Sequence, residues 1–284
     1  MRLMLGLPWY KGPDEDTYPQ YFDHQMYYGA LRERSLVRQA IGPENFSKLL
    51  PLLPPLDEGQ DALHRADPTE EEWTKLGKVE VVICNRGRLS LVGKAREMLV
   101  EDALELGADY LFCWDADMLF PAYTFLQLWR RQKPAVAALA YTAREPIHPV
   151  VYRMRWHEEQ GMEVIDGSDV VLDFPMGELL GDDEIGGPLA FGTGVVLFDM
   201  KLFREMPKPW FNSTGCGEDW FFCHRAAKHG IPRYVDTSVE AEHKMHAPRW
   251  ANSARYWRDR ETQREAYQAV FGEAVRRVER GKVI

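Results

Sequence analysis

Two aspartates, Asp115 and Asp117, follow an apolar segment that spans residues 108–114. Side chains two residues apart on an extended chain point to the same face, so both carboxylates can hold one divalent cation. In open α/β sheets, ligands collect at the carboxyl ends of the strands, which is where this pair would lie. Because the chain contains 44 Asp and Glu residues, an Asp-x-Asp spacing can arise by chance. It indicates a metal site only together with other motifs of the chain.

A second acidic pair, Glu218 and Asp219, follows Gly215 and Gly217 at the start of a predicted helix. Acids in a first helical turn are favoured by the helix dipole, so capping alone would explain them. Glycines beside them also favour a close approach by a ligand, because a glycine leaves the backbone uncovered. Both interpretations remain open on these residues alone.

Two histidines, His243 and His246, follow the last predicted strand. Imidazole nitrogen is a common metal ligand, although a lone histidine is more often a surface or core residue. Either histidine could approach the acidic pairs if the strand ends at the same edge of the sheet.

The elements that would position these side chains alternate between strand and helix, which predicts the α/β class. Strands are predicted at 2–7, 79–84, 108–114, 134–141, 150–156, 189–198 and 231–235, and helices at 20–40, 90–107, 122–132, 218–229 and 255–280. Ser90 is the expected N-cap of the second helix. The strand 189–198 is interrupted by Gly192 and Gly194, where a bulge or a ligand close to the backbone is expected.

Two stretches lack a clear periodic pattern. The proline-rich stretch 42–78 is expected to be an irregular insertion, and 158–187 is expected to be a loop because it is rich in Gly and Asp. We therefore predict a domain at 1–248 that contains the insertion, followed by a basic helical extension at 249–284.

Composition is that of a globular protein with a large core: 284 residues, 45% hydrophobic, with a net charge of −9. From Lys244 to the end, ten Lys and Arg residues face five acids, so this tail is basic and could face a polyanion. No apolar run is long enough to span a membrane, and the first residues do not form a signal peptide. A cytoplasmic location is expected, in the host cytoplasm if the protein is viral.

Taken in order, these motifs resemble those of metal-dependent GT-A glycosyltransferases, with family-2-like phage and bacterial enzymes nearest in character. The resemblance spans residues 2–246 and departs from the family in the insertion 42–78 and in Glu97, where an asparagine often stands. It rests on a first strand ending at Pro8, Ala95-Arg96 in a helix, Asp115-x-Asp117, Gly192-Thr193-Gly194, Glu218-Asp219-Trp220 and His243. It implies a GT-A, Rossmann-like fold with a mixed, mainly parallel sheet, flanking helices and a C-terminal helix.

The resemblance implies a nucleotide-sugar donor, a UDP-sugar first and a GDP-sugar second, bound with Mn²⁺ or Mg²⁺. In that arrangement Asp117 is a direct metal ligand, Asp115 binds the ribose or the metal, and His243 completes the shell, with His246 as its rival. A hard cation takes carboxylate oxygens and neutralises charge on the departing diphosphate, and an imidazole ligand favours Mn²⁺.

Further donor-binding residues are implied by position in the motifs. Pro8 and Tyr10 would line the base pocket, and Gly192 and Gly194 would let the donor approach the backbone. Arg96 would reach the base or the diphosphate, with a surface salt bridge as its alternative.

The acceptor side of the resemblance involves the second acidic pair. Asp219 would be the general base that takes the proton of the acceptor hydroxyl, which predicts inversion at the anomeric carbon, and Glu218 would orient the acceptor or the loop. If configuration is retained, Asp219 would position the acceptor instead.

Other functions compete with glycosyl transfer. A two-metal nucleotidyl or phosphoryl transferase also needs acids at a strand end, and a nucleotide-sugar-binding protein without turnover would keep the same residues. The acceptor could be a glycan, a protein hydroxyl, a lipid-linked group or a hydroxymethylated DNA base. The last of these would use the basic, aromatic-containing tail 244–284.

Overall fold

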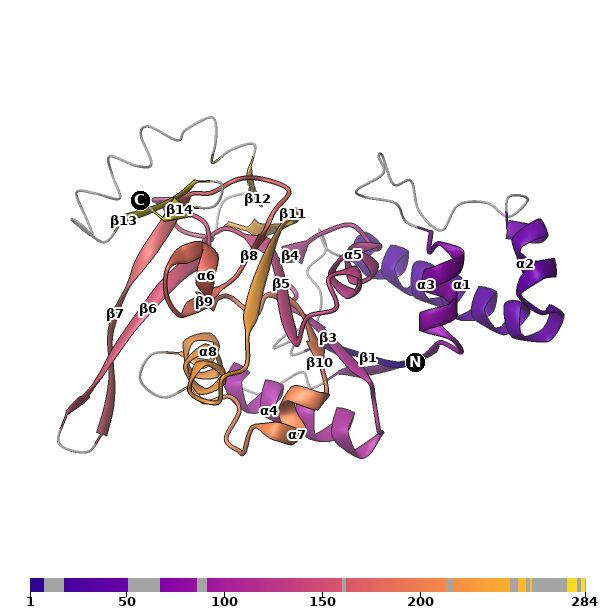
Figure 1. Cartoon of the computed structure of the whole chain (residues 1–284), viewed down its shortest axis with the longest axis horizontal. Helices are drawn as coiled ribbons and strands as arrows, with labels where there is room; N and C mark the ends of the chain where they lie inside the picture. The colour runs from indigo at the N-terminus through magenta and orange to yellow at the C-terminus, as the bar shows by residue number, and fades with distance from the viewer. Residues whose placement is uncertain are drawn as a thin grey trace.

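The structure is a computed structural model, and it describes residues 1–7, 18–50, 67–85, 91–159, 162–213, 217–245, 250–253, 256, 275–279 and 282–283. Helices α1 (Tyr18–Ile41), α2 (Pro43–Leu49) and α3 (Glu70–Leu76) lie at one end of the molecule (Figure 1). The hairpin of β6 (Val151–Glu159) and β7 (Met162–Asp173) lies at the other end (Figure 1). Among the described helices, none has the length and apolar character needed to cross a membrane.

A large mixed sheet forms the centre of the fold. Its strand order is β12 (Trp250–Ala251), β11 (Arg233–Lys244), β5 (Ala135–Ala140), β10 (Val195–Asp199), β3 (Tyr110–Trp114), β1 (Arg2–Leu7) and β2 (Glu80–Asn85). Strand β10 runs antiparallel to β3 and β5, whereas β2, β1, β3, β5 and β11 run in one direction. The predicted α/β class with a mixed, mainly parallel sheet is therefore confirmed.

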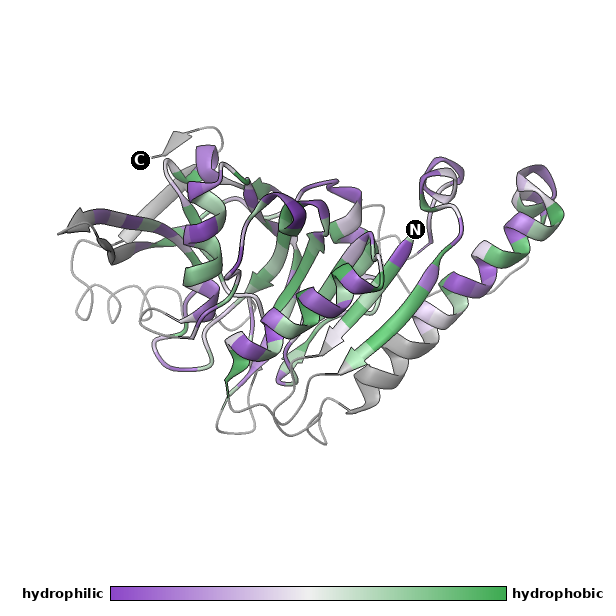
Figure 2. Ribbon diagram, turned by 90° about the horizontal axis from the view of Figure 1, so that it is seen from below, coloured by the Kyte–Doolittle hydropathy of each residue, from purple (hydrophilic) through white to green (hydrophobic). Residues whose placement is uncertain are grey.

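Helices cover both faces of this sheet, because strand side chains alternate between two hydrophobic cores. On β3, Leu111 and Cys113 point into one core, and Phe112 and Trp114 point into the other. The first core includes α4 (Val92–Glu105), α7 (Lys201–Glu205) and α8 (Glu218–Lys228); the second includes α1 (Tyr18–Ile41), α2 (Pro43–Leu49), α3 (Glu70–Leu76) and α5 (Thr124–Arg130). Figure 2 shows the hydrophobic central strands with amphipathic helices along them.

A second sheet is joined to the large one through residues 192–194. Its order is β14 (Lys282–Val283), β13 (Val275–Glu279), β7 (Met162–Asp173), β6 (Val151–Glu159) and β9 (Leu189–Phe191). From β9 the chain passes through residues 192–194 directly into β10 of the large sheet. The expected strand 189–198 is thus two strands in two sheets, broken at the glycines as predicted.

The stretch 42–78 is less irregular than expected. Helices α2 and α3 lie within it, and Phe46 and Trp73 pack edge to face with their ring centroids 5.5 Å apart. Helix α3 begins at a capping box in which Thr69 and Glu72 bond each other's backbone N–H groups. The sequence did not predict these short helices, because the many prolines obscure any helical pattern. Tertiary packing stabilises them more than their own helix propensity does.

Three other predicted elements differ from the structure. The expected loop 158–187 contains strand β7 and the short helix α6 (Asp182–Ile185). The expected terminal helix 255–280 is wrong at its end, where β13 is a strand; most of its other residues lie outside the described ones. Helix α4 has Leu91 as its N-cap residue, not Ser90, which itself lies outside the described residues.

Candidate functional site

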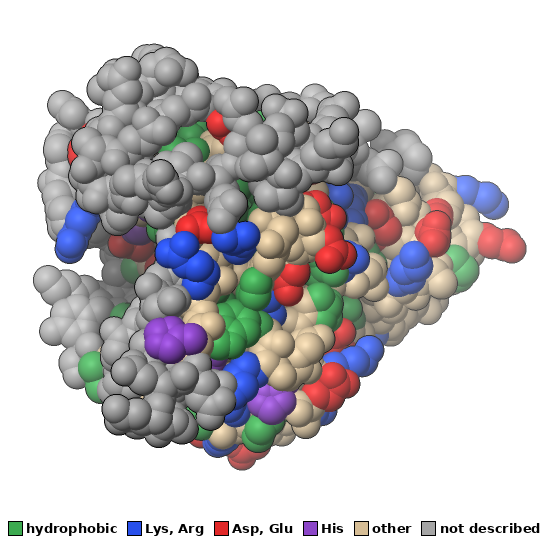
Figure 3. All heavy atoms as spheres, turned by 60° about the vertical axis from the view of Figure 1, so that its left-hand side comes forward, with side chains coloured by type: hydrophobic (Ala, Val, Ile, Leu, Met, Phe, Trp, Pro, Cys, Tyr) green, Lys and Arg blue, Asp and Glu red, His purple; other side chains and the backbone are tan. Residues whose placement is uncertain are grey.

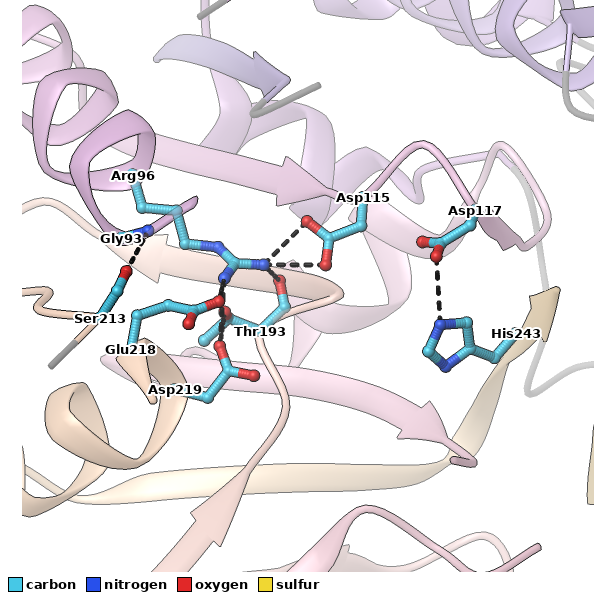
Figure 4. Close-up of polar contacts among 9 residues, drawn as sticks. All are labelled: Gly93, Arg96, Asp115, Asp117, Thr193, Ser213, Glu218, Asp219 and His243. Atoms are coloured by element: carbon cyan, nitrogen blue, oxygen red, sulfur yellow. Dashed lines mark hydrogen bonds and ion pairs between the residues drawn. The ribbon is translucent and has the colours of Figure 1, made fainter. Parts of the chain in front are cut away.

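A buried arginine joins the two acidic motifs at the carboxyl end of β3. Arg96, on α4, is 2% exposed, and its guanidinium lies among the carboxylates of Asp115, Glu218 and Asp219 (Figure 4). Its Nη2 atom donates to both oxygens of Asp115, at 2.8 and 2.9 Å, and its Nη1 atom donates to Glu218 and, at 3.2 Å, to Asp219. One cation therefore holds together acids that are more than 100 residues apart in sequence.

The charge balance keeps this arginine protonated. Burial alone would lower the pKa of Arg96, but the nearby carboxylates of Asp115, Asp219 and Glu218 outweigh it and raise the pKa. A guanidinium suits this position because its planar fork of five N–H donors can bond several carboxylates at once. The expected surface salt bridge is thus a buried network, and contact between Arg96 and a base or diphosphate stays a prediction.

Asp115 is fixed by its backbone as well as by its side chain. Its N–H donates to the carbonyl oxygen of Gly194 at 2.8 Å, which ties the end of β3 to the start of β10. Burial raises the pKa of Asp115, while Arg96 counteracts part of that rise. A Cβ atom on Gly194 would lie 3.6 Å from the Asp115 carboxylate and 3.3 Å from Met118, so the glycine keeps this corner compact.

Asp219 presents two unequal carboxylate oxygens. Its Oδ1 atom accepts hydrogen bonds from the Thr193 hydroxyl and from Arg96. Its Oδ2 atom faces Gly192, where an added Cβ would lie 3.8 Å away. Asp219 lies in the first turn of α8, where the positive end of the helix dipole stabilises its negative charge. One oxygen is therefore anchored, and the other faces the uncovered backbone of residue 192.

Residues without an obvious chemical signature complete the cluster. Gly93, in the first turn of α4, donates its N–H to the hydroxyl of Ser213 at 3.0 Å. A Cβ atom on Gly93 would lie 2.5 Å from that hydroxyl and 3.1 Å from the Cβ of Glu218. Sequence reasoning assigned no role to Gly93, Ser213 or Thr193; only Thr193, between two glycines, carried a local signal.

Asp117 and His243 form a separate pair beside this network. The His243 Nε2 atom lies 3.3 Å from Asp117 Oδ2 (Figure 4). Its Nδ1 atom lies 2.9 Å from the carbonyl oxygen of Tyr141. Because a carbonyl can only accept, Nδ1 carries a proton and Nε2 is the nitrogen turned toward Asp117. Burial would lower the pKa of His243, but the hydrogen bond and charge of Asp117 raise it; His243 correspondingly lowers the pKa of Asp117 against the effect of burial.

The Asp117–His243 pair fits a divalent cation chemically. Two ligand atoms that lie about 2.1 Å from one cation, at right angles to each other, are about 3 Å apart. The His243 Nε2 and Asp117 Oδ2 atoms are 3.3 Å apart, which is close to this value. Histidine ligands in metal sites commonly donate their other N–H to a carbonyl, as His243 does to Tyr141. Within the described residues, no group of three or more His, Cys, Asp or Glu side chains is arranged so that it could hold a metal ion.

Of the predicted site residues, the structure brings Arg96, Asp115, Glu218 and Asp219 into one network and pairs Asp117 with His243. Gly192 and Gly194 border both acidic motifs. Three candidates, Pro8, Tyr10 and His246, lie outside the described residues. Four carboxylates thus face one guanidinium and one imidazole, which leaves this region with excess negative charge.

Comparisons with known proteins concern the fold alone. No protein-family model and no curated protein sequence matches the chain. Among solved structures, A197 from STIV is 17% identical over 61% of this chain and 81% of its own, with a TM-score of 0.40. GalNAc-T7, solved with UDP, GalNAc and Mn²⁺, is 17% identical over 62% of this chain and 35% of its own, with a TM-score of 0.37. A UDP-glucose pyrophosphorylase complexed with UDP-glucose is 12% identical over 61% and 64%, with a TM-score of 0.33.

The surface beside β6 and β7 carries mixed charge. Basic, acidic and hydrophobic side chains are interspersed on this side of the molecule (Figure 3). Arg153 and Arg155 both pair with the buried Asp169, at 2.7 and 3.0 Å. The basic tail from which DNA contact was predicted lies mostly outside the described residues.

Proposed function

We propose that the protein is a metal-dependent GT-A glycosyltransferase that moves a sugar from a nucleotide-sugar donor, first a UDP-sugar, to an acceptor hydroxyl. The observation that carries this proposal is the bridge made by Arg96 between Asp115 and Asp219, next to the Asp117–His243 pair. A cation-binding pair and an anchored carboxylate then lie at one edge of the sheet, as transfer from a diphosphate to a hydroxyl requires.

In this proposal Asp117 and His243 would hold Mn²⁺ or Mg²⁺. The cation supplies charge neutralisation for the diphosphate that leaves. The Tyr141 carbonyl orients the His243 ring so that Nε2 faces Asp117. Asp115, held by Arg96, would face the ribose, and the uncovered backbone at Gly192 and Gly194 would border the sugar.

Asp219 would act as the general base. Arg96 and Thr193 bond its Oδ1 atom, which fixes the carboxylate and leaves Oδ2 to accept the proton of the attacking hydroxyl. Attack from the side opposite the departing diphosphate gives inversion at the anomeric carbon. Glu218, bonded to the same guanidinium, would fix the first turn of α8.

The proposal is tested by product analysis with nucleotide sugars and Mn²⁺. Transfer or slow donor hydrolysis should release nucleoside diphosphate, and Asp117→Asn or His243→Gln should reduce this at least about tenfold and weaken Mn²⁺-dependent thermal stabilisation by UDP. Asp183→Asn, an exposed change on α6, is the matched control. Pyrophosphate release would reassign the protein to nucleotidyl transfer, and tight donor binding without any turnover would make it a binding protein.

The role of Asp219 gives a separate prediction. Asp219→Asn keeps the shape of the side chain but removes its basicity, so we expect kcat to fall about 10²- to 10⁴-fold while donor affinity changes little. NMR of the first product should show the inverted anomer. Retained configuration would contradict the general-base role, and a loss of donor affinity equal to the loss of kcat would point to a role in folding or donor binding.

A further inference from the structure

A cavity of about 600 Å³ lies behind the ribbon formed by β4 (Met118–Leu119) and the end of β11. Its walls include Phe120, Tyr123, Met176, Ser238, Glu240 and Glu242. This volume falls in the usual range for small-molecule sites, which combine apolar walls with a few polar groups.

The cavity is separate from the candidate site because it lies on the other face of the ribbon. Met118 pairs with His243, and Leu119 pairs with Glu242. Paired side chains share a face and successive ones alternate, so His243 and Glu242 point to opposite sides. Leu119 and Glu242 line the cavity, whereas Met118 lies beside Gly194 of the candidate site.

A large irregularity in β11 creates this space. Ala138 and Leu139 are consecutive on β5, yet their partners on β11 are Asp236 and Glu240. Three residues, 237–239, are therefore inserted into β11 and form part of the cavity wall. Bulges of this kind commonly lie next to functional sites, where they redirect side chains.

The inserted residues are held in place, so the cavity is already formed. The Thr237 hydroxyl donates to the Pro175 carbonyl at 2.9 Å and accepts from the Glu178 N–H at 2.9 Å. Ser238 bonds the buried Asp236 through both its N–H and its hydroxyl, at 3.0 and 2.6 Å. A preformed wall lowers the cost of ordering the site when a ligand binds.

The side chains that line the cavity disfavour anionic ligands and can accept hydrogen bonds from hydroxyl groups. Among the described residues that line the cavity, none is Lys or Arg, so phosphate and carboxylate groups lack a counter-charge. Glu242 and Ser238 offer oxygen acceptors, and the half-buried Tyr123 and the exposed Met176 offer apolar surface. Burial and the charge of the neighbouring Glu242 raise the pKa of Glu240, and its carboxyl already accepts the N–H of Ser253.

We propose that this cavity binds a neutral saccharide. Hydroxyl groups would donate to Glu242 and Ser238, while the C–H face of a sugar ring would lie against Tyr123. The site is distinct from that of the donor, and saccharide binding does not depend on the proposed transferase activity.

The test uses the full chain and three probes, maltotriose, cellotriose and triacetylchitotriose, each followed by saturation-transfer NMR and calorimetry. We expect at least one probe to bind saturably at millimolar concentration, and Glu242→Gln and Tyr123→Ala each to weaken it at least about tenfold. Glu205→Gln, an exposed change on α7, is the control. Circular dichroism and thermal unfolding confirm that each variant is folded.

Several outcomes would overturn this assignment. They are no binding of any of the three saccharides, binding that both cavity variants leave unchanged, and binding of spermidine in place of the saccharides. Competition by UDP with Mn²⁺ would also overturn it, because the two ligands would then share the donor site. Saccharide binding by a protein that transfers no sugar would leave this inference standing while removing the proposed function.

Discussion

At the scale of single residues, Arg96 determines how the acidic motifs are arranged. Its guanidinium is the shared donor to Asp115, Glu218 and Asp219, each of which is partly exposed. Without it, three carboxylates would face each other at close range in a partly buried region, which is strongly unfavourable. In the proposed function Arg96 would therefore act through the acids that it positions, whether or not it also contacts the donor.

We expect Arg96→Ala to lower the free energy of unfolding by about 3–5 kcal/mol, because the three acids lose the guanidinium that they share. Arg96→Lys keeps the charge but loses the planar fork, so it should be more stable than the alanine variant yet at least about tenfold lower in kcat. Urea unfolding and donor turnover measure the two effects.

Arg233 provides the matched control for this prediction. It is as deeply buried and pairs with Asp182, away from the acidic motifs. Arg233→Lys should lower stability with little effect on kcat in the remaining folded protein. Equal losses of kcat in the two lysine variants would contradict a specific positioning role for Arg96.

The acids themselves were predictable from sequence, whereas their partners were not. Asp-x-Asp after an apolar strand and two acids at a helix start are local patterns, and His243 follows the predicted strand 231–235, although β11 extends to Lys244 and includes it. The Arg96 bridge depends on the distance between α4 and α8, which no local pattern encodes. Ser213 and Gly93 were missed for the same reason, since their contact joins segments 120 residues apart.

At the scale of elements, close contact between α4 and the segment before α8 is what brings the acids to Arg96. Gly93 permits it, because any side chain there would collide with Ser213. We expect Gly93→Ala to lower the melting temperature by several degrees and kcat at least about tenfold, since α4 must shift away from Glu218.

Gly29 on α1 is the control for this change. An added Cβ at that position meets nothing within 4 Å, so Gly29→Ala should stabilise the helix by about 0.5–1 kcal/mol and leave turnover unchanged. If Gly93→Ala also proved stabilising, the helix contact would not be what positions the acids. Thermal unfolding and turnover are measured on both variants.

Most strands and longer helices were predictable because their apolar residues recur regularly. Strand β7 was missed because its glycine and aspartates are typical of a loop, yet β6 pairs with it along almost its whole length. Strand β11 was predicted to end at residue 235, since the insertion at 237–239 interrupts its pattern before pairing resumes at Glu240. In both strands, pairing with a neighbouring strand determines the structure, and the local sequence does not show this pairing.

At the scale of the whole molecule, His148 links folding stability to pH. It is buried beside Tyr152, and burial lowers its pKa to about 4. Above pH 6.5 its imidazole is neutral in the folded and unfolded chain. As pH falls from about 6.5 to about 4, only the unfolded chain gains the proton, so the folded state loses up to about 3 kcal/mol relative to the unfolded one.

We therefore expect His148→Gln to be less sensitive to acid than the unaltered protein across this window. Urea unfolding at several pH values between 4 and 7 measures the slope for both proteins, and other titrating groups contribute equally to both. Identical slopes would contradict a buried neutral His148. Below pH 4 the two slopes should become alike, because His148 is then protonated in both states.

The antiparallel strand β10 has a consequence for how the protein can evolve. It begins at Val195, and residues 192–194 join it to β9 of the second sheet. Thr193, which bonds Asp219, and the Gly194 carbonyl, which accepts the N–H of Asp115, therefore lie in one three-residue junction. Inserting or deleting a residue there would displace partners of both acidic motifs together. Length variation in this molecule should therefore accumulate in the stretch 42–78 and at the β6–β7 turn, and homologous chains should keep the spacing from β9 to β10 unchanged.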